Sequence, residues 1–74
     1  MTFNYTAYIE WDGESGTYIG RVPGIVGAHT FAETLDELQL KLKEVVLLCL
    51  EEMDDEEIKN IPVFAGLSQI EVAR

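Results

Sequence analysis

The stretch of residues 17–50 constrains the fold of this chain more than any other part of the sequence. It contains an extended run that ends at Val22-Pro23-Gly24, then a short segment over residues 27–30, then a long apolar run that opens at Thr34. The Thr34 hydroxyl can accept a hydrogen bond from the backbone N–H of Glu37, whose carboxylate can reach back to the N–H of Thr34. This arrangement is a capping box, which predicts the start of a helix.

An alternating pattern at the N-terminus predicts the first strand of a hairpin. Apolar side chains occupy every second position from Phe3 to Trp11, and mostly polar ones lie between them. A turn cluster over residues 12–16 separates this run from a return strand over residues 17–22. The return strand ends at Pro23, because proline has no N–H to donate to the sheet.

The rest of the chain predicts a third strand over residues 28–31, a helix from residue 34 to about residue 53, and a last strand over residues 69–73. At about 100° per residue, one stripe of the helix is apolar and should lie on the sheet. The stripe consists of Leu35, Leu38, Leu42, Val45, Val46, Cys49, Leu50 and Met53. We therefore expect one α+β domain over residues 1–74, in the order β-β-β-α-β, with a mostly antiparallel sheet and one helix on one face.

The small size of the chain predicts self-association. Seventy-four residues bury a modest core, and Cys49 is the only cysteine, so no internal disulfide can support it. We expect a homodimer or a higher homo-oligomer. Leu40 and Leu47 fall outside the sheet-facing stripe, two turns apart, and are the candidates for a subunit interface. The alternative is that they are ordinary exposed leucines.

The net charge of −9 restricts the possible partners. It opposes direct binding to nucleic acid or to an anionic membrane, and it favours a basic partner. Residues 1–5 lack the features of a signal peptide, and no apolar run reaches the roughly 18 residues of a membrane span. Together with the single thiol, these features favour the cytoplasm.

The order and spacing of these segments resemble the HicB-like antitoxin family. The features that match are residues 5–11, Gly16-Thr17-Tyr18, Val22-Pro23-Gly24, residues 27–30, Glu33-Thr34, residues 35–37 and the apolar helix. Ala32 stands where the family often has glycine, and Leu38 stands where it often has alanine. The resemblance implies a reduced ribonuclease-H-like fold and a partner of the HicA type, a small basic toxin that cleaves mRNA. It also implies that the domain covers the active site of that toxin. No DNA-binding domain follows residue 73, so we do not expect direct promoter binding.

We expect a protein-interaction module of the antitoxin type that is not an enzyme and that needs no cofactor or metal. The alternative is a stand-alone regulatory or ligand-binding domain with no toxin partner. The acidic run over residues 51–57 could imitate RNA phosphates, although such runs are usually solvated faces. Its candidate partner-binding residues are Glu51, Glu52, Asp54 and Asp55. Trp11 is a further candidate as an aromatic anchor, although core packing against the helix is its default interpretation.

Three other groups of side chains have chemistry that catalysis can use, and a structural interpretation is favoured for each. His29 is the only histidine and lacks a supporting triad pattern, so a strand or loop histidine is the favoured interpretation. Cys49 lies in the apolar stripe and is expected to act as a small hydrophobic residue. Glu10 and Asp12 could hold a divalent metal with Glu37 or Asp36, as in a metal-dependent nuclease. Solvent-facing carboxylates at a strand end are the favoured interpretation, because an acidic chain repels a polyanionic substrate.

Overall fold

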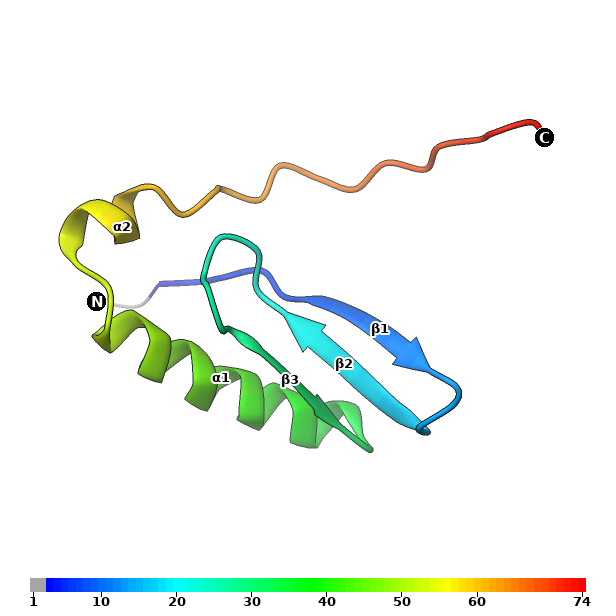
Figure 1. Cartoon of the computed structure of the whole chain (residues 1–74), viewed down its shortest axis with the longest axis horizontal. Coiled ribbons are helices and arrows are strands. Elements are labelled where there is room, and N and C mark those ends of the chain that lie inside the picture. The colour runs from blue at the N-terminus through cyan, green and yellow to red at the C-terminus, as the bar shows by residue number, and fades with distance from the viewer. Residues whose placement is uncertain (1–2) are drawn as a thin grey trace.

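The computed structural model describes residues 3–74 of the chain (Figure 1). This part contains three strands and two helices. They are β1 (Tyr8–Asp12), β2 (Thr17–Arg21), β3 (His29–Ala32), α1 (Leu35–Glu51) and α2 (Asp55–Lys59). The strands form one antiparallel sheet in the order β1-β2-β3. The long helix α1 covers one face of this sheet, chiefly over β2 and β3. The predicted α+β class and the β-β-β-α order are therefore confirmed.

A network of hydrogen bonds shapes the turn between β1 and β2. The N–H of Gly16 donates to the carbonyl of Asp12 over 2.9 Å, and Gly16 adopts a φ of 68°, which glycine reaches without steric cost. The Asp12 carboxylate accepts from the Glu14 N–H at 3.1 Å and from the Ser15 hydroxyl at 2.9 Å. These contacts fix the hairpin and give the Asp12 side chain a structural role.

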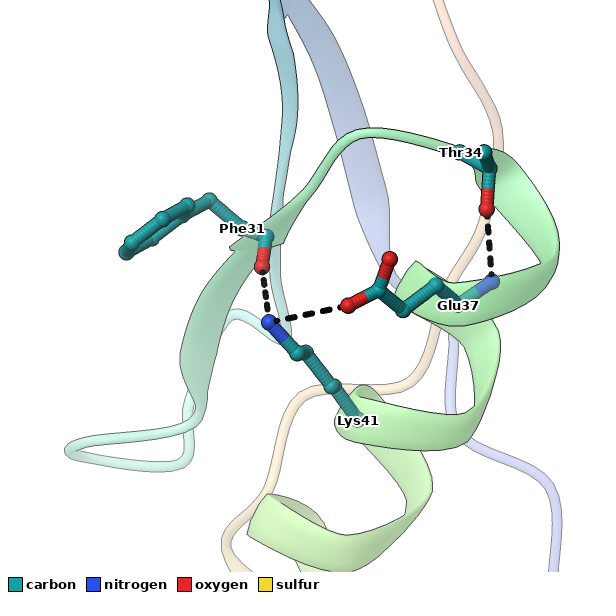
Figure 2. Close-up of polar contacts among 4 residues, drawn as sticks. All are labelled: Phe31, Thr34, Glu37 and Lys41. Atoms are coloured by element: carbon teal, nitrogen blue, oxygen red, sulfur yellow. Dashed lines mark hydrogen bonds and ion pairs between the residues drawn. The ribbon is translucent and has the colours of Figure 1, made fainter.

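The start of α1 is capped and is tied to the edge of the sheet (Figure 2). The Thr34 hydroxyl accepts from the N–H of Glu37 at 3.1 Å, as predicted. The Glu37 carboxylate does not complete the predicted capping box, and turns instead to Lys41, with 3.4 Å between Oε1 and Nζ. Lys41 Nζ also donates to the carbonyl of Phe31 at 3.0 Å. The side chain of Lys41 thus joins the first turns of α1 to β3.

The core under α1 depends on a close approach between the helix and β2. Leu38 is fully buried, and Leu42 and Ala32 complete its cluster. A Cβ atom at Gly20 would lie 2.9 Å from Leu42 Cδ1 and 3.3 Å from Leu38 Cδ2, so a larger residue there would have to displace the two leucine side chains. A second cluster further along α1 contains Val22, Ile25 and Ala28, with Val46, Cys49, Leu50, Met53 and Ile61 packed against it. The predicted apolar stripe of α1 therefore faces the sheet, except that Leu35 is half exposed.

The predicted last strand does not form within this chain. Residues 62–74 leave α2 as an extended segment that runs past the β1 side of the sheet, and no residue of this segment belongs to a strand in the described structure (Figure 1). The alternation of residues 69–73 gives the segment an extended conformation, but a strand also needs a neighbour for its backbone hydrogen bonds. The first strand is also shorter than predicted: β1 begins at Tyr8, and residues 3–7 belong to no strand. Residues 1–2 lie outside the described residues.

Candidate interaction surfaces

The acidic segment, residues 51–57, contains the end of one helix and the start of another. The helix α1 ends at Glu51, earlier than the predicted residue 53, and Glu52 is its C-cap. Asp54 is the N-cap of α2, where its carboxylate accepts from the Glu57 N–H at 2.8 Å. The Glu57 carboxylate in turn accepts from the Asp54 N–H at 3.3 Å. The spacing Asp-x-x-Glu is itself a capping-box signal. In this sequence it is hidden within a run of acidic residues.

This division separates the four acidic candidates into two pairs. All four are exposed. Asp54 and Asp55 stand at the start of α2, where negative charge is stabilised by the helix dipole. Glu51 and Glu52 stand at the end of α1, where negative charge opposes the dipole and the last turn has no basic residue. The fold therefore accounts for Asp54 and Asp55, and it gives the side-chain carboxylates of Glu51 and Glu52 no structural role.

Trp11 lies on the surface, so its default interpretation as a core residue is wrong. Its side chain is 58% exposed, and its ring packs on Tyr18 with 4.8 Å between centroids and 59° between planes. Trp11 and Ile9 lie opposite Tyr18 and Gly20, on the side of the sheet that carries α1. Because α1 covers chiefly β2 and β3, this part of β1 stays open, and Ile9 is also exposed. We call the surface formed by Ile9, Trp11 and Tyr18 the aromatic shelf.

The aromatic shelf and the acidic segment lie at opposite ends of the molecule. Trp11 is next to the β1–β2 turn, near the start of α1, whereas the acidic segment follows the end of α1 (Figure 1). The helix between them has 17 residues and is about 25 Å long. The structure therefore brings Glu51, Glu52, Asp54 and Asp55 together and places Trp11 in a separate surface.

The outer side of α1 carries exposed leucines. Leu40 and Leu47 are 66% and 55% exposed, and Leu48 beside them is also exposed. None of the three belongs to the clusters under the helix. Their position agrees with the prediction that they lie outside the sheet-facing stripe, and self-association through them stays a prediction.

The face of the sheet opposite α1 is a surface that the sequence analysis missed. Tyr8, Ile19 and Phe31 are exposed there, one on each strand. Arg21 lies 6.0 Å from the ring centroid of Tyr8, and Lys41 Nζ lies 5.4 Å from that of Phe31. The sequence feature that indicates this surface is the other half of the strand alternation. In each strand, one apolar residue lies between the residues that face the helix and therefore points away from it.

The side chains considered for catalysis are dispersed. His29 lies on β3 opposite Arg21 and is exposed, and Cys49 is partly buried on the core side of α1. Asp12 is engaged by the hairpin turn, while Glu10 stands opposite Ile19. Within residues 3–74, no three His, Cys, Asp or Glu side chains gather in a way that could hold a metal ion. Over the same residues, no helix is both long enough and apolar enough to cross a membrane.

An open groove separates the N-terminal segment from the C-terminal one. Its volume is about 740 Å³. Asn4, Tyr5 and Tyr8 line one side, and Val63, Phe64 and Gly66 line the other. Both sides are extended chain, and the residues from 3 to 7 and from 62 to 74 belong to no strand.

Comparison with known proteins places the chain in one family of small proteins. Residues 4–68 match the family model described as a Domain of unknown function (DUF1902). A UPF0150 protein of Thermotoga maritima is 46% identical over 68 residues, which cover 92% of this chain and 88% of that protein. UPF0150 proteins of Synechocystis and Archaeoglobus fulgidus are 39% and 38% identical, over 80% and 92% of this chain and over 81% and 93% of their own lengths. No solved structure matches the chain.

Proposed function

The chain belongs to the DUF1902 family, and we propose that it is a HicB-like, antitoxin-type interaction module that binds and covers a small basic mRNA-cleaving toxin of the HicA type. The proposal assigns its action to the cytoplasm, where a lone thiol such as Cys49 stays reduced. It assigns no catalytic step, cofactor or metal to the chain. It also includes self-association through Leu40 and Leu47 on the outer side of α1.

The observation that carries the proposal is the pair Glu51 and Glu52. Both carboxylates are exposed at the end of α1 where they oppose the helix dipole, so they cost the fold stability. Leu48 is exposed one turn before Glu52 and supplies an apolar contact beside the charges. An apolar contact with acidic neighbours is a suitable surface for a basic protein, because the charges steer the encounter while burial stabilises the complex.

The test is the affinity of the purified chain for a basic HicA-type protein encoded beside its gene. Changing Glu51→Gln and Glu52→Gln together is expected to weaken the affinity about three- to tenfold at low salt, since each exposed ion pair contributes about 0.3–0.7 kcal/mol. Asp54 is left intact, because its change would disturb the cap of α2.

The matched control is Glu14→Gln with Glu33→Gln, which removes the same charge from two other exposed positions. The control is expected to bind nearly as tightly as the original chain. Equal affinity of all three proteins, with no salt dependence, would show that Glu51 and Glu52 are not part of the toxin-binding surface.

The alternative function, a regulatory or ligand-binding domain without a toxin, is favoured by one observation. The groove between Tyr5, Tyr8 and Phe64 has room for a small molecule, with a volume of about 740 Å³. Its test is a screen of metabolites by thermal shift with the original chain and with Tyr5→Ala. A ligand that stabilises the original chain and not the variant would favour this alternative.

A further inference from the structure

The C-terminal tail, residues 62–74, exposes apolar side chains that the fold leaves uncovered. Leu67, Ile70 and Val72 are 81%, 78% and 71% exposed. Ile70 and Val72 alternate with the polar residues Gln69 and Glu71, which is the period-two pattern of a strand with one apolar face. The tail is extended but, in the described structure, pairs with no strand.

The outer edge of β1 is open to pairing with an extended segment such as this tail. The strand pairs with β2 on one side, and its other row of backbone N–H and C=O groups has no strand beside it among residues 3–74. Natural edge strands are commonly protected by charged side chains, above all lysine, or by proline. Tyr8–Asp12 has two charged residues, of which Asp12 is engaged by the hairpin turn and Glu10 lies on the face opposite α1. On the side that carries α1, this strand also presents Ile9 and Trp11 of the aromatic shelf, both exposed.

The chain exposes more surface than a compact monomer of its mass. A compact monomer of 8.3 kDa exposes about 4,600 Å². This chain exposes 6486 Å², an excess of roughly 1,900 Å². Its radius of gyration is 14.2 Å, against about 11 Å for a compact chain of this length. A stable dimer buries about 800 Å² on each partner, so the excess is large enough to supply such an interface.

We propose that the tail of one copy adds as a fourth strand to the β1 edge of a second copy, and that two copies exchange tails reciprocally. Ile70 and Val72 would then extend the apolar layer of Ile9 and Trp11, and the backbone of the tail would pair with the free row of β1. The sheet would gain the strand that the alternation of residues 69–73 predicts.

The occupant of the edge is a second copy because the tail stands away from the edge of its own sheet. Pro62 packs on Gly24, and the groove of about 740 Å³ lies between Asn4–Tyr8 and Val63–Gly66. The tail also suits association between acidic chains. It carries one acidic residue, Glu71, and one basic residue, Arg74, so its side chains bring no net charge to the interface of two chains that each carry −9.

The first test is the mass of the purified assembly in solution, measured by light scattering. Ile70→Lys with Val72→Lys is expected to halve that mass, because both side chains would be buried against the aromatic shelf. The control Gln69→Lys with Ala73→Lys adds the same charge to the other face of the same strand and is expected to leave the mass unchanged. The proposal would be overturned if the first variant kept the mass of the original assembly. It would also be overturned if the first variant and the control lost mass alike.

The second test is hydrogen exchange of the backbone amides of β1 in the original chain at several protein concentrations. Exchange between copies predicts that the β1 edge is protected at high concentration and loses at least tenfold of its protection on dilution below the dissociation constant. The amides of β2 serve as the control for folding. Protection of the edge that does not change with concentration would mean that the tail folds back on its own sheet, and would refute exchange. This proposal does not depend on a toxin, so either proposal can fail without the other.

Discussion

The contact between Gly20 and α1 predicts a specific pattern of stability changes. In Gly20→Ala, the new Cβ would lie 2.9 Å from Leu42 Cδ1 and 3.3 Å from Leu38 Cδ2, inside normal van der Waals distance. Overpacking of this kind costs about 1–3 kcal/mol. Replacing glycine also lowers the entropy of the unfolded chain, which returns about 0.4–1 kcal/mol. The net effect is a loss of roughly 1–2 kcal/mol, which is a large part of the stability of so small a domain.

The same contact predicts that a second change will be non-additive. Leu42→Val removes the two Leu42 Cδ atoms, which the new Cβ would meet at 2.9 and 3.3 Å, and leaves the contact with Leu38 Cδ2. Made alone, it costs about 1 kcal/mol. With Gly20→Ala present, the smaller side chain relieves the clash. The double variant should therefore be more stable than the sum of the two single changes predicts, by about 1 kcal/mol.

The assay is urea unfolding followed by circular dichroism, at one fixed protein concentration because self-association adds to the measured stability. Gly13→Ala is the matched control, since its Cβ would lie 3.8 Å from Trp11 Nε1, an ordinary contact. The control should change the free energy of unfolding little. The close approach of α1 to β2 would be refuted if Gly20→Ala had the same free energy of unfolding as the original chain. It would also be refuted if the effects of Gly20→Ala and Leu42→Val were strictly additive.

Three further predictions concern the caps of α1 and α2 and the outer side of α1. Thr34→Ala removes the N-cap bond and should lower the free energy of unfolding by about 1 kcal/mol, measured by urea unfolding, with Thr34→Ser as the variant expected to retain it. Leu40→Lys with Leu47→Lys should reduce the mass of the assembly by light scattering, and an unchanged mass would remove these leucines from the subunit interface. Asp54→Ala should destabilise α2 by about 1 kcal/mol, which hydrogen exchange of the α2 amides measures. Glu52→Gln should leave the free energy of unfolding unchanged or raise it by a few tenths of a kcal/mol, which urea unfolding measures.

The parts of the fold that the sequence predicts are those set by local periodicity and caps. The 3.6-residue period places Leu38 and Leu42 under the helix, and Thr34 marks where the helix starts. The alternation of the first strand predicts its two faces, but it cannot tell which strands the helix covers. From the sequence, core packing is therefore the default interpretation of Trp11 and a partner-binding anchor is the alternative, whereas in the structure α1 lies chiefly over β2 and β3 and Trp11 is exposed.

The last strand and the acidic segment show two other limits of sequence reasoning. Residues 69–73 have the pattern of a strand, yet pairing depends on a partner edge that the pattern does not name. Asp54 and Glu57 belong to a short capped helix whose signal was present but hidden in a run of acidic residues. Only the structure separates these two from Glu51 and Glu52, whose charge the fold does not use.

Binding of a small basic protein to the surface formed by Leu48, Glu51 and Glu52 can be tested by affinity capture from the native cytoplasm at low salt. The original chain, the Glu51→Gln/Glu52→Gln variant and the Glu14→Gln/Glu33→Gln control would be used as baits, and the retained proteins identified by mass spectrometry. We expect the original chain and the control to retain one small basic protein at low salt and to release it at high salt, and the first variant to retain it poorly. Capture of nothing beyond copies of the chain itself, or equal retention by all three baits, would contradict it.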